Sequence, residues 1–105
     1  MDIQKIRKRF IPMSETMFFI LYSLRQERHG YGIMQYVEEL TKSRITLGAG
    51  TIYQSISKLE HDGLITAKQE IARKKNYLIT DIGNEILNEE ARRIGELYEI
   101  VKELV

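Results

Sequence analysis

Residues 47–65 constrain the fold of this chain most, because they combine a helical pattern with start and stop signals. Small residues at positions 48–50 precede the pattern, and Gly63 is well placed to end a helix in the left-handed conformation. Within residues 50–62 the apolar side chains recur at helical spacing, at Ile52, Ile56 and Leu59. The stretch therefore predicts an amphipathic helix with one buried face.

The opposite face of this predicted helix carries short or flexible hydrogen-bonding side chains and no long acidic side chain before Glu60. Such groups can contact base edges and phosphates in a DNA major groove. The pattern is typical of a recognition helix, although an ordinary solvated face explains the helix equally well when it is taken alone. The candidate contacts are Thr51, Gln54, Ser55 and Lys58.

The segment after this helix favours the DNA-binding interpretation. Residues 64–71 and 76–80 are rich in β-branched and aromatic side chains, which predicts two short strands. Between them lies a hairpin tip, residues 72–75, with three consecutive cations: Arg73, Lys74 and Lys75. A recognition helix followed by a basic hairpin is the plan of a winged helix-turn-helix, whose wing lies along the DNA backbone or in the minor groove.

The rest of the chain completes a mainly α fold with a small β-hairpin. Ser14 is the expected N-cap of an apolar helix over residues 15–28, and the glycines at 30 and 32 separate it from a second helix that ends near residue 42. The expected organisation is a basic N-terminal segment (1–13), a winged helix-turn-helix domain (14–80) and a C-terminal dimerisation helix (81–105).

The N-terminal segment places Ile3, Ile6 and Phe10 on one helical face among four cations. Three interpretations stay open from the sequence alone. The segment is a helix that docks on a partner subunit, an arm near DNA phosphates, or a disordered terminus.

The C-terminal helix carries apolar residues at alternating steps of four and three, which is the spacing of a heptad seam. Because the helix begins after the winged domain is complete, we expect a partner helix to cover this seam, in preference to a return onto its own core. A second apolar line, Ile86, Leu97, Ile100 and Leu104, widens the face. The predicted dimerisation residues are Leu87, Ala91, Ile94, Leu97, Tyr98, Val101, Leu104 and Val105.

Composition excludes several functional classes. The chain has 105 residues and no cysteine, which excludes disulfides and thiolate metal sites. Its first ten residues lack the apolar core of a signal peptide, and no apolar run is long enough to span a bilayer, so we expect a cytoplasmic protein. His29 and His61 lie beside glycine-containing turns without ligand spacing, so we expect no metal, no cofactor and no catalysis.

Charge is sorted along the chain. Residues 1–80 hold 13 Lys and Arg against 8 Asp and Glu, whereas residues 81–105 hold 3 against 7. A basic body with an acidic tail is consistent with a polyanion-binding domain whose tail points away from the polyanion.

Four spaced motifs resemble the PadR family of transcriptional regulators. They are Gly30-Tyr31-Gly32-Ile33, Gly50-Thr51-Ile52-Tyr53, Gly63-Leu64-Ile65, and the junction from Lys75 to Gly83. The chain departs from the family pattern at Gln54, where many members have proline, and in its short wing.

The resemblance implies a transcriptional regulator that binds double-stranded DNA. A two-fold homodimer would present two recognition helices to successive major grooves, so we expect a near-palindromic operator. We expect a repressor, with an activator as the alternative that the sequence leaves open.

The resemblance also implies that Tyr31 and Tyr53 contact phosphates, with core packing as the alternative for each. A small aromatic or lipophilic effector is a further partner that the resemblance admits, although simple core packing is favoured for the residues that would line its site: Met17, Phe18, Phe19, Tyr22 and Tyr98. A winged-helix protein–protein interaction module is the alternative function.

Overall fold

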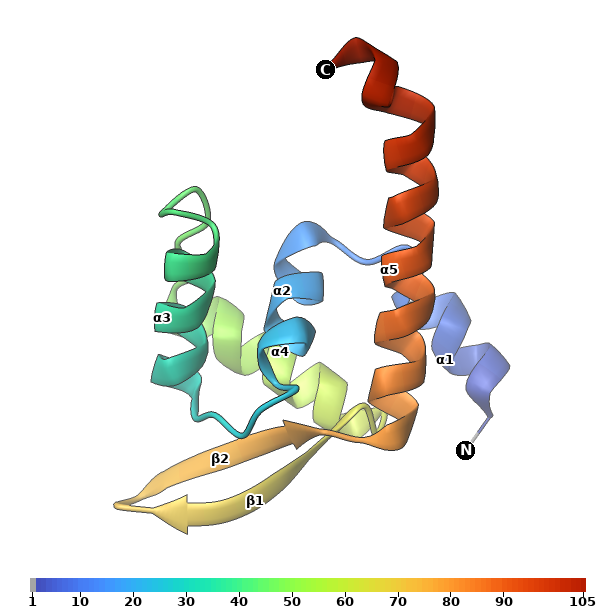
Figure 1. Ribbon diagram of the computed structural model, residues 1–105. Coiled ribbons are helices and arrows are strands. Elements are labelled where there is room, and N and C mark those ends of the chain that lie inside the picture. The colour runs from blue at the N-terminus through green and yellow to red at the C-terminus, as the bar shows by residue number, and fades with distance from the viewer. Residues whose placement is uncertain (1) are drawn as a thin grey trace.

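The computed structural model describes residues 2–105 as five α-helices, a short 3-10 helix and a two-stranded antiparallel hairpin (Figure 1). Helices α2, α3 and α4 form the body, the hairpin extends from one edge of it, and α5 projects away on the other side with α1 packed against its lower half. None of the described helices is long and apolar enough to cross a membrane. The elements are α1 (Ile3–Phe10), α2 (Glu15–Ser23), α3 (Gly30–Leu40), α4 (Ala49–His61), β1 (Ile65–Ile71), β2 (Lys74–Ile79), α5 (Asp81–Val101) and η1 (Lys102–Leu104).

Helix α2 begins where predicted, with the Ser14 hydroxyl accepting a hydrogen bond from the Met17 amide at 3.1 Å, but it is shorter than expected. The prediction that it continues to residue 28 is wrong. The Leu24 carbonyl accepts from the Ile79 amide at 2.8 Å, and Arg28 exchanges two backbone hydrogen bonds with Tyr77. The chain therefore leaves the helix in a turn at Leu24 and Arg25 and meets β2 at Arg28, because the hairpin satisfies backbone groups that a longer helix would use itself.

Helix α1 packs against its own chain, which none of the three interpretations of the N-terminal segment anticipated. Ile6 and Phe10 are fully buried in the common core. The Arg7 guanidinium donates to Glu89 on α5 at 2.9 Å, and Arg9 donates to Asp62 at the end of α4 at 2.7 Å. Helix α1 therefore links the C-terminal helix to the end of α4.

Helix α4 has the predicted amphipathic character, with Ile52, Ile56 and Leu59 buried. Gly63 follows it with φ of 80°, so the predicted left-handed stop is confirmed. The hairpin turns through only Ala72 and Arg73, both at positive φ, as in a tight two-residue hairpin turn. The expected four-residue tip is therefore too long, and Lys74 and Lys75 belong to β2.

Helix α5 contributes a buried carboxylate to the core. Glu90 is fully buried. It accepts hydrogen bonds from the Met13 amide, at 2.6 Å, and from Nε and Nη2 of the Arg93 guanidinium. The hydrogen bond from Arg93 holds the pKa of Glu90 below its usual value, and the Met13 amide lowers it further. Glu90 thus holds the link between α1 and α2 against α5.

The start of α5 lies directly on the end of α4. The Thr80 hydroxyl donates to the Gly63 carbonyl at 2.6 Å and accepts from the Gly83 amide at 3.1 Å, while the Thr80 amide donates to the Leu64 carbonyl at 3.0 Å. A Cβ atom on Gly83 would lie 2.0 Å from that same carbonyl oxygen. Only glycine fits at this crossing.

Replacing Gly83 by alanine should lower the free energy of unfolding by about 1–3 kcal/mol, because the added methyl group meets backbone that cannot move aside. Urea unfolding measures the change. Gly95→Ala is the matched control, since nothing lies within 4 Å of its Cβ position, and it should raise stability by about 0.5–1 kcal/mol. Equal changes in stability from the two substitutions would contradict the close approach of Gly83 to the Leu64 carbonyl.

Glu90→Gln should cost about 1.5–3 kcal/mol of stability at pH 7, because it removes a charge-assisted hydrogen bond in the core. Since the folded pKa of Glu90 is lowered, this stabilisation is complete above the unfolded value of about 4.3 and is lost as pH falls through the folded pKa. Urea unfolding from pH 7 to pH 3 should show that the difference in the free energy of unfolding between wild type and variant narrows below about pH 4. A stability difference that does not change with pH, or the same loss of stability in the exposed control Glu96→Gln, would contradict a stabilising role of the Glu90 carboxylate.

Candidate nucleic-acid interface

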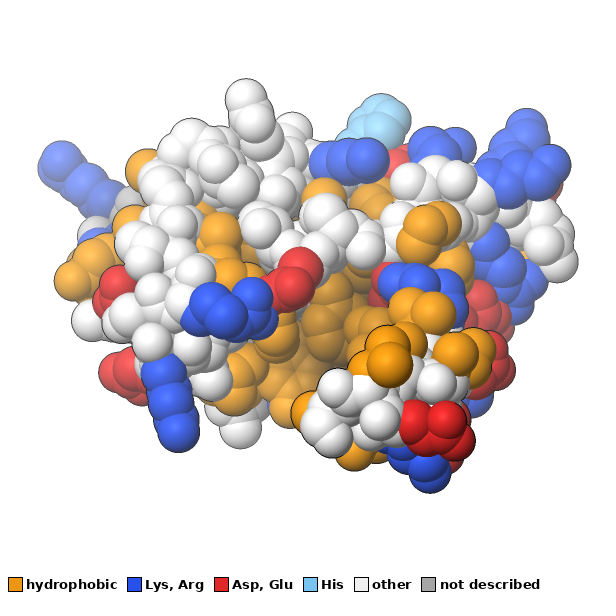
Figure 2. Space-filling view, turned by 90° about the horizontal axis from the view of Figure 1, so that it is seen from above, with side chains coloured by type: hydrophobic (Ala, Val, Ile, Leu, Met, Phe, Trp, Pro, Cys, Tyr) orange, Lys and Arg blue, Asp and Glu red, His pale blue; other side chains and the backbone are white. Residues whose placement is uncertain are grey.

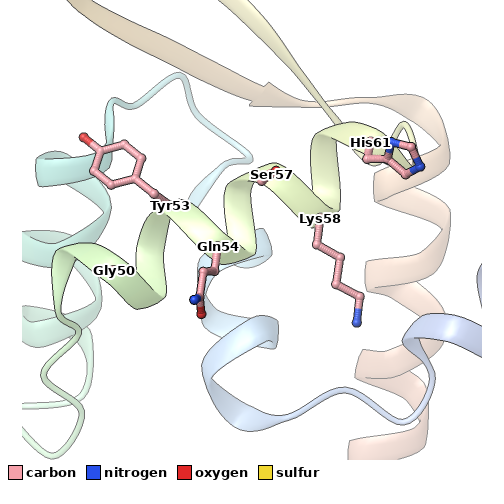
Figure 3. A pocket seen from close by; sticks show the side chains of 6 residues that line it. All are labelled: Gly50, Tyr53, Gln54, Ser57, Lys58 and His61. Atoms are coloured by element: carbon pink, nitrogen blue, oxygen red, sulfur yellow. The ribbon is translucent and has the colours of Figure 1, made fainter.

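The outward face of α4 is open and polar along its whole length. Six residues line a shallow surface hollow of about 660 Å³ on this face (Figure 3). No acidic side chain is among them, so phosphates can approach the face without repulsion. The lining residues are Gly50, Tyr53, Gln54, Ser57, Lys58 and His61.

The structure refines which polar side chains occupy this face. Thr51, Gln54 and Lys58 are exposed as expected, whereas Ser55 is half-buried on the flank. Ser57 and His61 point outward and were not among the residues predicted from the sequence. The signal that could have found them is helical spacing, because Gly50, Gln54, Ser57 and His61 follow one another at steps of four, three and four.

A second hollow, of about 290 Å³, lies where the hairpin, the start of α3 and α4 meet. It brings together Tyr31, Tyr53 and all three predicted wing cations, which come from three separate parts of the sequence. Both predicted tyrosines are exposed, Tyr31 by 56% and Tyr53 by 57%, so neither is a core residue. The lining residues are His29, Gly30, Tyr31, Tyr53, Arg73, Lys74, Lys75 and Tyr77.

The chemistry of this second hollow suits an anion. Burial raises the pKa of the Tyr77 hydroxyl, and the Glu60 carboxylate raises it further, so the hydroxyl stays neutral and can donate. The side-chain Nδ1 of His29 accepts from the Gly32 amide at 3.1 Å, which fixes the start of α3 beside the tyrosines. Cations and neutral hydroxyl donors on one concave surface are the groups that bind phosphate oxygens.

The residues predicted to dimerise divide into two groups. Leu87 is only 4% exposed and packs in the core of its own chain, so its assignment to a subunit interface is wrong. Ile86, from the second apolar line, is buried in the same way. The later part of α5 and the segment that follows it stay exposed, at Ala91, Ile94, Leu97, Tyr98, Ile100, Val101, Leu104 and Val105.

An apolar hollow of about 370 Å³ lies beside the exposed part of α5. Phe18, Phe19 and Met13 line it from the α1–α2 side and Ile94 from α5, and three charged residues, Glu15, Arg44 and Arg93, complete the lining. Seen from above, down the length of α5, apolar side chains form the floor of a depression beside the projecting helix (Figure 2).

The five residues considered for an effector site have different surroundings. Phe18 and Phe19 line this hollow, whereas Tyr22 stacks on Tyr36 and lies under the guanidinium of Arg25, 3.7 Å from it. Met17 packs against the core and Tyr98 is 58% exposed on α5. Core packing accounts for Met17, as favoured from the sequence.

Comparison with known proteins gives the family. The profile of the Transcriptional regulator PadR-like family matches residues 20–89, which include α3, α4, the hairpin and the start of α5. The chain belongs to this family. The resemblance noted from the four motifs and the winged-helix fold are both confirmed.

Two relatives of this PadR-like chain carry the name of transcriptional regulators. It is 32% identical over 97 residues to the Transcriptional regulator YqjI of Escherichia coli K12, covering 91% of this chain and 47% of that protein, so it spans about half the length of that relative. It is 31% identical over 93 residues to the Transcriptional regulator Rv3488 of Mycobacterium tuberculosis, covering 86% of this chain and 84% of that protein.

Solved structures show the same fold. A PadR family regulator from Clostridium difficile matches with a TM-score of 0.74 at 22% identity, over 87% of this chain and 98% of that one. Bacillus subtilis PadR in complex with operator DNA matches with a TM-score of 0.65 at 31% identity, over 72% of this chain and 46% of that one. The family and these structural neighbours are transcription regulators and not enzymes, as the sequence predicted.

Proposed function

We propose that this PadR-like chain is a sequence-specific, double-stranded DNA-binding transcriptional repressor that acts as a homodimer. The observation that carries the proposal is the placement of the polar face of α4 next to the hollow that holds the wing cations. The first surface has groups that distinguish bases, and the second has groups that hold phosphates. The complex of Bacillus subtilis PadR with operator DNA supports the DNA-binding part of the proposal.

In this proposal α4 enters the major groove with Gln54 at the centre of its exposed face. Thr51 and Lys58 lie on the same exposed surface, and Ser57 and His61 extend it toward the C-terminal end of the helix. Ser55 contacts DNA only from its half-exposed flank. Amide and hydroxyl side chains can hydrogen-bond base edges, which makes this row the source of sequence preference.

The second hollow binds the phosphate backbone beside that groove. Arg73, Lys74 and Lys75 supply charge, while Tyr31 and Tyr53 supply hydroxyl donors. Because these groups contact phosphates, they contribute affinity and orientation without sequence preference.

The homodimer uses the exposed apolar part of α5. Large side chains there remain in contact with solvent in the single chain, including Ile100, which is 73% exposed, and a dimer would bury them. A two-fold arrangement presents two recognition helices to successive major grooves, about 34 Å apart. The operator is then a near-palindrome with half-sites about one helical turn apart.

Substituting residues from the two surfaces should separate their roles. On a randomised duplex library, Gln54→Ala should narrow the spread of affinities, because it removes an amide that contacts a base. The binding free-energy difference between preferred and other duplexes should fall by about 1–3 kcal/mol. Lys74→Ala should weaken binding to all duplexes alike. It should also reduce the slope of log affinity against log salt concentration by about 0.9 for each phosphate that is no longer neutralised. Binding to immobilised duplexes between about 50 and 200 mM salt measures both effects.

If Gln54→Ala lowered the affinity for every duplex equally, the assignment of base recognition to Gln54 of α4 would be wrong. Failure of the wild-type chain to show salt-sensitive duplex binding would overturn the whole proposal and leave the protein–protein interaction module as the function.

Placing a charge in the seam should prevent dimerisation. Val101→Lys should yield a monomer because a lysine at this position would be buried without a partner in the dimer. Glu99→Lys is the matched control, since Glu99 is exposed on the side of α5 opposite both apolar lines, and this variant should stay a dimer. Sedimentation equilibrium measures the mass of each variant, and a wild-type monomer at micromolar concentration would contradict the proposal.

A further inference from the structure

Helix α1 borders the recognition face on the side opposite the wing. Tyr53 lies on one flank of α4, in the hollow that contains the wing cations. On the other flank the ammonium of Lys58 lies 5.2 Å from the centre of the Phe10 ring of α1, and Arg9 of α1 forms a two-bond pair with Asp62, the C-cap of α4. The exposed face of α4 therefore lies between two cationic elements, and the proposed function uses only one of them.

The cations of α1 face three directions. Arg7 faces α5, where its guanidinium contacts Glu89 and Glu85. Arg9 faces α4, and Lys5 precedes it by four residues, so both lie on the flank of α1 toward the recognition helix. Lys8 lies between these flanks on the outer side. Lys5 and Lys8 are exposed and form no ion pair with any residue from 2 to 105.

Two of the acidic groups near this surface, Asp62 and Glu89, are already paired with arginines of α1. Asp62 is engaged by Arg9 at 2.7 Å and is only 11% exposed at its side chain, and Glu89 is engaged by Arg7 at 2.7 Å. Asp2 caps the start of α1, where its carboxylate accepts from the Gln4 amide at 3.0 Å. Since no carboxylate among residues 2–105 forms an ion pair with Lys5 or Lys8, both ammonium groups can contact an external anion.

We infer that α1 is a further phosphate-contacting element of this chain, in which Lys5 and Lys8 bind the DNA backbone beyond the C-terminal end of the recognition helix. The inference rests on the proposed function. Arg9 neutralises Asp62, so the carboxylate that ends α4 does not repel the approaching backbone. The wing holds the phosphates on one side of the groove that α4 enters, and α1 holds those on the other side.

The test compares the salt dependence of binding to a pool of random-sequence 30-base-pair duplexes, roughly three helical turns long. The double variant Lys5→Gln, Lys8→Gln should weaken binding to all sequences alike. It should reduce the slope of log affinity against log salt concentration by about 0.9 for each phosphate that these lysines neutralise in the wild type. The spread of affinities across sequences should stay unchanged, because phosphate contacts carry no sequence preference.

Two further variants make the outcome decisive. Lys42→Gln removes one positive charge, as each substitution of the double variant does, from the loop after α3. This loop lies at the other end of the molecule from the wing, so the variant should leave the slope unchanged (Figure 1). Lys74→Gln tests the wing. If Lys74→Gln lowers the slope and the α1 double variant does not, the inference is overturned and the proposed function stands. If the wild-type chain shows no salt-dependent binding, both are overturned.

Discussion

The contact between the start of α5 and the end of α4 determines the arrangement of the whole molecule. Thr80 bonds to the carbonyl of Gly63 and to the amide of Gly83, and Gly83 lies so close to the Leu64 carbonyl that no other residue fits. The recognition helix, the hairpin and the C-terminal helix therefore meet within a few residues. Because one junction fixes all three, the polar face of α4 and the wing cations keep a defined position relative to the helix that we propose for dimerisation.

Helix α5 has two roles along its length. Its first half belongs to the core, where Ile86 and Leu87 are buried and Glu90 holds the α1–α2 link. Its second half projects beyond the body with apolar side chains in contact with solvent, beside the hollow lined by Phe18 and Phe19 (Figure 2). Helix α1 adds a connection in the other direction, from α5 through Arg7 to α4 through Arg9. The proposed dimer surface is thereby linked to the proposed DNA surface by short, charge-assisted contacts.

The sequence predicted the elements whose signals are local. The periodicity of Ile52, Ile56 and Leu59 and the stop at Gly63 placed α4 within one residue at each end, and the four motifs identified the family. Predictions failed where a distant segment decides the structure. The hairpin, not local propensity, ends α2 by bonding to Leu24 and Arg28, and the core, not the heptad pattern, buries Leu87. Helical spacing alone could have placed Ser57 on the outer face, whereas the convergence of Tyr31, Tyr53 and the wing required the tertiary structure.

The most direct test of the account is selection of bound duplexes from a random pool at about 150 mM salt, with the mass of the protein–DNA complex measured alongside. The account predicts enrichment of a near-palindrome whose half-sites lie about 10 base pairs apart, bound by two copies of the chain. Absence of an enriched sequence, with binding that disappears as salt rises, would contradict sequence-specific recognition and leave only attraction between charges.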